Sequence, residues 1–372
     1  MKTLDAQASA AAGAADPGWL AARRQAALDY YDKLDMPSDR EEVWRYVDLD
    51  FTFDDFALVE QPGEAHDIDT GIAAALPETA GWMRVVDGHA TAVDAGDGRA
   101  VFGSLRALLA DNSELFEPHV AQGTASDLNK FAAAHTAFAG DGAILVVPPG
   151  AAIEQPFFID VQAATDGAVA FPLVTLVTGR SSQASVVIRY RSPDDVNALV
   201  VPNLELVVGA NSQLKVSVVQ NWGTNTTSIS HLRAAVDRDA SLHLGEAGLG
   251  AALSRLELQI DLEGNGSSAN VVGAYFGDDT QTLDYRYTMH HQGLNTASDM
   301  FLKGAVQGES LSIFTGMIRI DEEAQKTNAY QTNRNLILSD GAAAQSVPNL
   351  EILANDVRCG HGSTMGPLDE EQ

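Results

Sequence analysis

The chain has 372 residues, more than one typical domain, so we expect a core domain with smaller appendages. Its 51 acids against 23 lysines and arginines give a net charge of −28, a field that repels phosphate and argues against nucleic acid or anionic membranes as partners. The acids are spread along the whole chain. We therefore interpret them as the lysine-poor surface of a halophilic protein rather than as a docking face for a basic partner.

Cysteine usage and the N-terminus predict the compartment. A single cysteine, Cys359, excludes an internal disulfide framework and a self-contained metal or cluster site built from four thiolates. The first twelve residues contain Asp5 and no continuous apolar core, which makes a poor signal peptide. No run approaches the roughly 20 apolar residues that span a bilayer. These features predict a soluble cytoplasmic protein.

Residues 1–140 are expected to form a mostly helical N-terminal region. Asp16 and Pro17 read as the N-cap and first position of a helix that runs to about Leu34. Ser38-Asp-Arg-Glu41 fits a capping box for a second short helix that contains Trp44.

Residues 60–100 are mixed and turn-rich, with little pattern. Two helices are predicted within 103–139, and Ser126 is a plausible N-cap for the second of them, 127–138. At about Gly142 the sequence pattern changes to short, alternating apolar runs, which marks the start of a different region.

Residues 141–366 are predicted to form a right-handed parallel β-helix. Short alternating apolar runs, such as 143–147, 173–177 and 204–208, read as strands. Turns of small residues that begin at 149, 179, 209, 237, 263, 293 and 321 separate them at intervals of about 26–30 residues, a period typical of solenoids. Because the units lack a helical crossover, the pattern predicts stacked strand–turn–strand units that bury their inner side chains against each other.

Within the last strand-like stretch, Leu350–Gly362, Cys359 and His361 lie two residues apart and are expected to face the same side, with Gly360 between them leaving room for close approach. Thiolate and imidazole are ligands for zinc, copper and iron–sulfur centres, but two ligands cannot close a four-coordinate site. Further ligands would have to come from elsewhere in this chain or from another chain. The residues alone favour a buried cysteine and a structural histidine over a metal or cluster site.

Other candidates are weaker. Glu351 and Asp356 flank the Cys–His pair, and either could orient His361 through its second ring nitrogen, although both also fit solvated acids. Counting along a single strand favours Glu351, because it would share the face of Cys359. His290 and His291 are adjacent and should point to opposite faces, so we interpret them as structural.

Several segments resemble the SufB/SufD family, the scaffold subunits of the SUF system for iron–sulfur cluster assembly. The similarity is strongest in the runs 326–339, 347–352 and 355–366, and it extends to Thr282-Leu-Asp-Tyr-Arg286, Phe314–Ile320 and the Trp-containing Glu42–Leu49. SufB carries a functional cysteine in the segment that aligns with Gly341–Ala344, which has none here. The resemblance is therefore to the SufD branch.

The resemblance implies a β-helical scaffold flanked by helical regions, and not an enzyme. It places Cys359 and His361 on the face that meets a SufB-like paralogue, where a transient cluster would form between subunits and none would remain on the isolated chain. It also implies an ATPase partner, SufC, that docks on C-terminal helices. Residues 367–372 are then expected to be the start of a truncated C-terminal helical region.

Two alternatives stay open at this point. β-Helices also carry carbohydrate-active enzymes, which need clustered carboxylates in a solvent groove, and the many acids of this chain do not exclude such a cluster. The third possibility is a purely structural solenoid that mediates protein contacts and uses Cys359 and His361 as fillers.

Overall fold

A computed structural model describes residues 2–66 and 78–367 of the chain. The described helices are α1 (Ala6–Ala12), α2 (Gly18–Lys33), α4 (Leu105–Phe116) and α5 (Lys130–Phe138), with 3₁₀ turns at Glu42–Trp44 and Phe53–Asp55. The strands are β1 (Ala57–Leu58), β2 (Gly81–Val86), β3 (His89–Asp94), β4 (Val101–Ser104), β5 (Gly142–Val147), β6 (Phe157–Gln162), β7 (Ala168–Ala170), β8 (Leu173–Thr178), β9 (Gln183–Arg191), β10 (Ala198–Val200), β11 (Asn203–Val208), β12 (Gln213–Asn221), β13 (Thr227–Val236), β14 (Ser241–Gly248), β15 (Leu253–Leu262), β16 (Ser268–Gly277), β17 (Thr282–His291), β18 (Ala297–Val306), β19 (Leu311–Ile320), β20 (Asn328–Ile337), β21 (Ala343–Ile352) and β22 (Arg358–Pro367).

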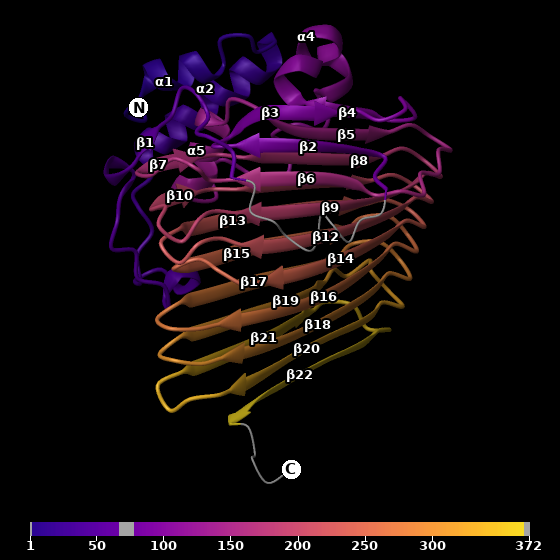
Figure 1. Cartoon of the computed structure of the whole chain (residues 1–372). Helices are drawn as coiled ribbons and strands as arrows, with labels where there is room; N and C mark the ends of the chain where they lie inside the picture. The colour runs from indigo at the N-terminus through magenta and orange to yellow at the C-terminus, as the bar shows by residue number, and fades with distance from the viewer. Residues whose placement is uncertain (1, 67–77, 368–372) are drawn as a thin grey trace.

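The strands form a β-solenoid, which confirms the predicted fold class (Figure 1). Its long strands alternate between two sheets. Sheet A has the order β21-β19-β17-β15-β13-β11-β8-β5-β4, and sheet B has the order β22-β20-β18-β16-β14-β12-β9-β6-β2-β3. Within the stack, from β8 to β20, the long strands pair in parallel with the strands one turn before and one turn after them, as β17 does with β15 and β19. Inner side chains are therefore buried by neighbouring turns.

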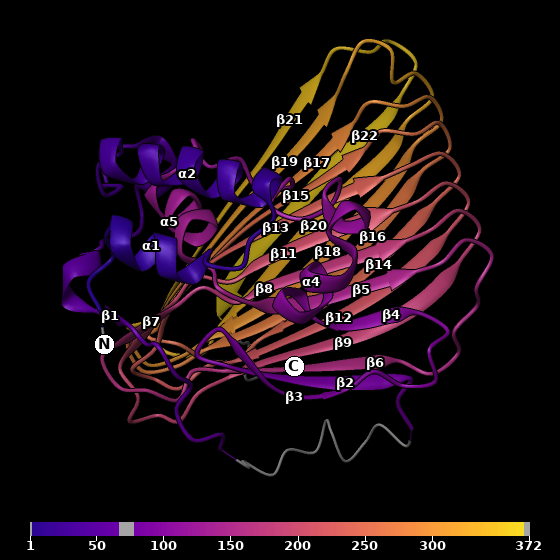
Figure 2. The same ribbon diagram turned by 90° about the horizontal axis from the view of Figure 1, so that it is seen from above.

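The N-terminal region covers one end of this stack. Strand β2 joins sheet B beside β6, while β3 and β4 add antiparallel edges to the two sheets. Helices α1, α2 and α5 gather on one side of the solenoid and α4 lies at the covered end (Figure 2). Residues 60–100 had shown little pattern; residues 67–77 lie outside the described chain, and the structure finds β2 and β3 in the rest, a short hairpin whose outer strand is partly exposed.

The helix starts differ from those expected. Asp16 does not cap α2; its carboxylate pairs with Arg24 Nε at 2.8 Å, and Pro17 occupies the cap position without a side-chain bond. The side chain of Asn129, not Ser126, caps α5 by accepting a hydrogen bond from the Ala132 N–H. Within the described residues, no helix is long and apolar enough to cross a membrane.

A column of left-handed residues sets the repeat. One residue with positive φ occurs in each of seven successive turns from sheet A to sheet B: Gly150, Ser181, Asn211, Asp239, Gly266, Asn295 and Lys326. The N–H of each donates to a carbonyl one turn further along, from Gly150 to Arg180 O at the start to Lys326 to Asp356 O at the end. Glycine, asparagine and aspartate tolerate this conformation best, which explains why small polar turn residues recurred in the sequence.

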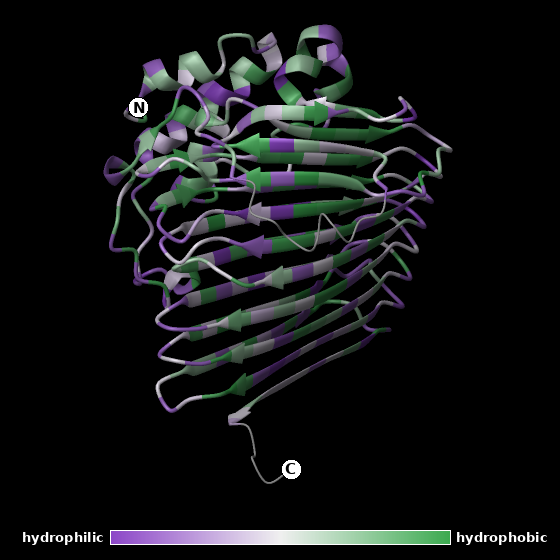
Figure 3. Ribbon diagram, viewed as in Figure 1, coloured by the Kyte–Doolittle hydropathy of each residue, from purple (hydrophilic) through white to green (hydrophobic). Residues whose placement is uncertain are grey.

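Strands near the covered end are more hydrophobic than those toward the C-terminus (Figure 3). In the later turns the solenoid interior holds polar side chains among the apolar ones, including the buried residues Tyr275, Tyr285, Gln331, Asn333 and Asn335. The Tyr275 hydroxyl bonds to both Asn333 and Asn335. The interior is therefore apolar at one end and hydrogen-bonded at the other.

Glu246 is the exceptional inner residue. It projects from β14 into a cavity of about 40 Å³ that Gln220, Leu244 and Ser254 also line. No ion pair reaches it within the described residues, and burial raises its pKa to about 8. The carboxyl is therefore mostly protonated at neutral pH.

We expect Asn295→Val to lower the free energy of unfolding by about 1–2 kcal/mol, because a β-branched residue is strained at the observed φ of 57°. Asn295→Gly is the matched control and should leave stability nearly unchanged. Thermal unfolding of both variants checks the role of the turn column. Equal destabilisation by valine and glycine would show that the asparagine side chain matters and the backbone conformation does not.

Glu246 should make stability fall as pH rises. Its pKa is raised in the folded state, so the folded protein keeps the proton up to about pH 8 while the unfolded chain loses it near pH 4.5. The favourable contribution is complete below pH 4.5 and is lost as pH rises from there through 8. The difference in unfolding free energy between wild type and Glu246→Gln should follow this window, whereas Glu322→Gln, in an exposed turn, should not. A difference that is constant between pH 5 and 8 would contradict the assignment.

Candidate functional site at the open end of the solenoid

The C-terminal end of the stack is uncovered in the described part of the chain. Strands β21 and β22 are the last members of their sheets, and each pairs only on its inner side. The stretch Leu350–Gly362 is not one strand, as expected from the sequence, but the end of β21, a turn and the start of β22. Its two halves therefore belong to different sheets.

Cys359 and His361 lie on the same face of β22. They stand in register with Ala329 and Gln331 of β20, both of which are buried inside the solenoid. The cysteine and the histidine therefore continue the inner face into the last turn, where Cys359 packs against the core and His361 is exposed. The same-face prediction agrees with this geometry.

Their backbone is also available at the edge. The Arg358 N–H donates to Thr327 O of the preceding turn. Alternate residues of a parallel strand bond to opposite neighbours, so Cys359 and His361 direct their N–H and C=O groups toward the unpaired side. A strand from another chain could pair with β22 directly at these two residues.

Burial raises the pKa of the Cys359 thiol, although a hydrogen bond from the Gly360 backbone works in the opposite direction. The isolated chain thus holds the thiol in its protonated, less reactive form. Gly360 does not open space on the Cys–His face. A Cβ there would meet the Tyr330 ring on the outer face at 3.2 Å, so the glycine allows close contact with that ring.

The two flanking acids lie elsewhere. Glu351 is on the outer face of β21, with its carboxylate 3.9 Å from Arg319 Nη1, and so does not share the face of Cys359. Counting along one continuous strand failed here because a turn intervenes. Asp356 lies in that turn, where its backbone binds Lys326 N–H and the Gln325 side chain. Neither acid has a recorded contact with His361 in the described residues.

The paired histidines are held by local contacts. His291 points inward and bonds to Thr296 and Ser298 hydroxyls at 2.8 and 2.9 Å, and burial lowers its pKa to about 4. His290 points outward between Asp261 and Asp321, each at 3.0 Å, and these carboxylates raise its pKa. Opposite faces and separate networks agree with the structural interpretation.

Sequence reasoning missed the polar floor beneath the site. Gln331 lies directly under His361 in the register, and its Nε2 donates to Asn349 O of β21 at 3.1 Å. Its Oε1 is buried without a partner in the described residues, as is the Ser346 hydroxyl. Gln331 thus links the ends of the two sheets behind the Cys–His pair. The only sequence signal for Gln331 is that it belongs to the alternating positions 329, 331, 333 and 335, which face inward on β20.

The segments that carried the resemblance have a structural role. Asp284, in Thr282–Arg286, faces outward and accepts from the buried Arg255 guanidinium. Arg255 in turn donates to Val43 O at 2.9 Å and lies 3.8 Å from the Trp44 ring centroid. The aspartate and tryptophan therefore join the N-terminal segment to the side of the solenoid.

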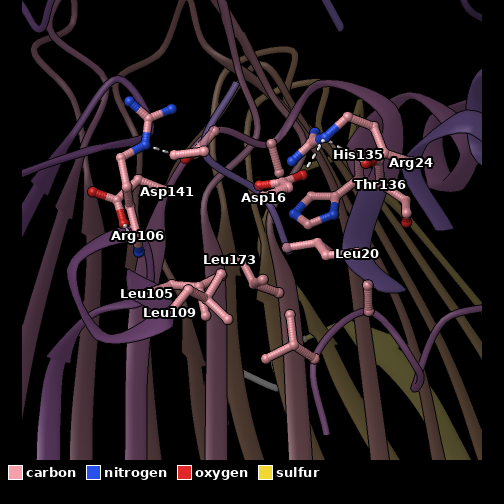
Figure 4. A pocket seen from close by; sticks show the side chains of 15 residues that line it. Asp16, Leu20, Arg24, Leu105, Arg106, Leu109, His135, Thr136, Asp141 and Leu173 are labelled. Carbon is pink, nitrogen blue, oxygen red and sulfur yellow. Dashed lines mark hydrogen bonds and ion pairs between the residues drawn. The ribbon is translucent and has the colours of Figure 1, made fainter. Parts of the chain in front are cut away.

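The hollow beneath the N-terminal helices is small, and polar side chains that line it bond to one another or to nearby backbone groups (Figure 4). It measures about 30 Å³ and lies among Arg24, Arg106, His135 and Asp141. Arg24 binds Asp16 and the Thr136 and Ala137 carbonyls, while burial lowers the pKa of His135 to about 3. We assign this hollow to the packing of helices on sheet A.

Within residues 2–66 and 78–367, no three histidine, cysteine or acidic side chains form a group that could hold a metal ion. The open end therefore presents one thiol and one imidazole beside two strand edges that are unpaired in the described chain.

Comparison with known proteins identifies the class. The profile of the SUF system FeS cluster assembly, SufBD core domain, matches residues 160–372, and the profile of the SufBD protein N-terminal region matches residues 4–159. The chain therefore belongs to the SufBD family of the SUF iron–sulfur cluster assembly system.

Individual relatives agree with this assignment. An iron–sulfur cluster assembly SufBD family protein of Mycobacterium tuberculosis is 33% identical over 59% of this chain and 56% of its own length. The iron–sulfur cluster assembly protein SufD of Bacillus subtilis is 26% identical over 96% of this chain and 84% of its own length. The match thus spans little more than half of the mycobacterial relative, and nearly the whole chain matches the Bacillus protein.

We predict that Cys359 reacts slowly with iodoacetamide at neutral pH and that its rate rises only at a pH above the ordinary thiol pKa, because burial disfavours the thiolate. The unfolded chain supplies the control, since the same thiol is then fully solvated. Mass spectrometry of the modified peptide at several pH values measures both rates. A folded chain that reacts as fast as the unfolded one would show that the thiol is not held protonated.

Proposed function

We propose that this protein is a SufD-like scaffold subunit that assembles iron–sulfur clusters together with a SufB-like paralogue in the cytoplasm. The observation that carries the proposal is the uncovered end of the solenoid, where Cys359 and His361 share one face of the last strand. The nascent cluster is the cargo of this site. The chain itself would act by binding and positioning and would not catalyse a reaction as an enzyme.

The geometry supports a shared site in two ways. One thiol and one imidazole are too few to close a cluster site, so a partner must add ligands. The unpaired edges of β21 and β22 allow a partner to bind there, because a second solenoid can pair its own edge strands with them. The partner would then bring its ligands to the same face.

The raised pKa of Cys359 fits a site that becomes active only on assembly. A thiolate is needed to bind iron, and iron binding itself favours deprotonation. The isolated chain should therefore hold no stable cluster, and a partner that brings iron or further ligands would shift Cys359 to the thiolate. A SufC-like ATPase would supply the energy for rearrangement from outside this chain.

The carbohydrate-active alternative gains no support from the described residues. The buried acids Asp160 of β6 and Asp284 of β17 lie on different sheets, and each is held by arginines. The purely structural alternative predicts that His361 is dispensable, and the following experiment separates it from the proposal.

His361→Ala should impair cluster assembly by the complex with its paralogue and leave the solenoid folded, because the exposed side chain contributes little to packing. His243→Ala, on the exposed outer face of β14, is the matched control. The measurements are thermal unfolding of each variant and cluster maturation in cells that depend on the protein. A large fall in unfolding temperature would favour a structural role, and normal maturation would remove His361 from the site.

A further inference from the structure

The outer face of sheet B departs from the charge balance of the chain. Its outward positions on β12, β14, β16, β18, β20 and β22 alternate with the buried inner residues, and the strands can be followed in Figure 1. The charged residues among them are Lys215, Asp299, Lys303, Arg334 and Arg358. Four cations thus face one acid here, whereas the whole chain carries 51 acids against 23 lysines and arginines.

The acids of the same turns are placed at the ends of the strands. Asp237 and Asp239 precede β14, Glu263 precedes β16, and the run Asp321-Glu-Glu323 precedes β20. Among the outward positions of these six strands, Asp299 of β18 is the one carboxylate, and it stands opposite Tyr330. Since acidic residues fill the exposed turns, their scarcity on this exposed sheet face is a local feature.

Aromatic and cationic side chains meet at the centre of the face. Lys303 Nζ lies 5.5 Å and Arg334 Cζ lies 5.9 Å from the centre of the Phe301 ring. Lys303 and Arg334 stand opposite each other in the β18–β20 register, and Val272 stands opposite Phe301. We call the set of Val272, Phe301, Lys303, Tyr330, Arg334 and Leu336 the Phe301 patch.

Several large apolar side chains of the patch are exposed to solvent. Val272, Tyr330 and Leu336 retain 48%, 47% and 45% of their surface, and no ion pair reaches Lys303 or Arg334 in the described part of the chain. The strands are held by their backbone ladder and by the inner face. An exposed tyrosine and an exposed arginine around a half-buried phenylalanine, with Asp299 as the one outward acid of β18 and β20, make a composition typical of protein interfaces.

We propose that the Phe301 patch is a docking surface for an acidic segment of another protein. Carboxylates of such a segment would pair with Lys303 and Arg334, and its apolar side chains would cover Phe301, Val272 and Leu336. The surface is separate from the open end and does not depend on the function proposed above. It adds a second partner site to the side of the solenoid.

Charge favours this occupant over two others. A nucleic acid would meet the same cations, but its continuous phosphate charge would also meet the acidic turns on both sides of the face. A second copy docked symmetrically would place Lys303 and Arg334 against the same cations of its partner, which is unfavourable. A short acidic segment can place a few carboxylates at the cations and avoid the turns.

Binding of defined probes to the full chain tests the proposal. The probes are a fluorescent twelve-residue peptide of alternating glutamate and leucine, the same peptide with glutamine for glutamate, and a single-stranded DNA of twelve nucleotides. We expect the glutamate peptide to bind and the other two to bind at least about ten-fold more weakly. Arg334→Glu should weaken glutamate-peptide binding by about ten-fold, while Arg180→Glu, the same change at an exposed turn, should have little effect.

The possible outcomes separate the occupants. Binding that is lost equally in both charge-reversal variants would show a general electrostatic effect and overturn the proposal. Tighter binding of the DNA, or concentration-dependent dimerisation that Arg334→Glu abolishes, would assign the face to nucleic acid or to a second copy instead. Unchanged thermal unfolding of Arg334→Glu ensures that a loss of binding reflects the surface.

Discussion

A turn of a solenoid buries its inner side chains only when another turn lies on each side of it. The two ends of this protein meet that constraint in different ways. At one end, antiparallel strands and helices from residues 2–140 complete the stack. At the other end, the described chain stops with two sheets whose last strands are paired on one side only. The inner face of the last turn is therefore partly open to solvent, and Cys359 and His361 lie on that face.

The same constraint explains why the interior changes along its length. Near the covered end the core is apolar, since nothing polar needs to reach solvent. Toward the open end, Gln331, Asn333 and Asn335 of β20 point inward and connect to Tyr275 and β21. A hydrogen-bonded interior tolerates partial hydration better than an apolar one, because its groups find partners in either state. Such an interior suits the open end, whose last turn is partly exposed in the described chain.

Much of the fold could be predicted from the sequence because two simple signals repeat. Alternating apolar residues marked β5, β8 and β11, and small turn residues at intervals of about 26–30 marked the solenoid. The helix caps at Asp16 and Ser126 were wrong because a long-range partner, Arg24, and a better local cap, Asn129, compete with them. Local propensity does not include such competition.

The site was predicted only in part. Alternation correctly placed Cys359 and His361 on one face, but it could not show that this face is the inner one or that a turn separates it from Glu351. Gln331 gave no signal of its own, since its importance comes from its position in register one turn below His361. The register between neighbouring turns depends on how the whole stack packs, and a local sequence pattern does not reveal it.

The column of left-handed turn residues has a consequence for how such a scaffold can change in evolution. Each turn repeats the same backbone step and the same N–H to carbonyl link from Gly150 to Lys326. Duplication or loss of one whole turn would lengthen or shorten the molecule by about 4.8 Å without altering which residues face inward. The distance between the helical cap and the open end is thus adjustable in discrete units, while the inward orientation of Cys359 and His361 at that end is preserved.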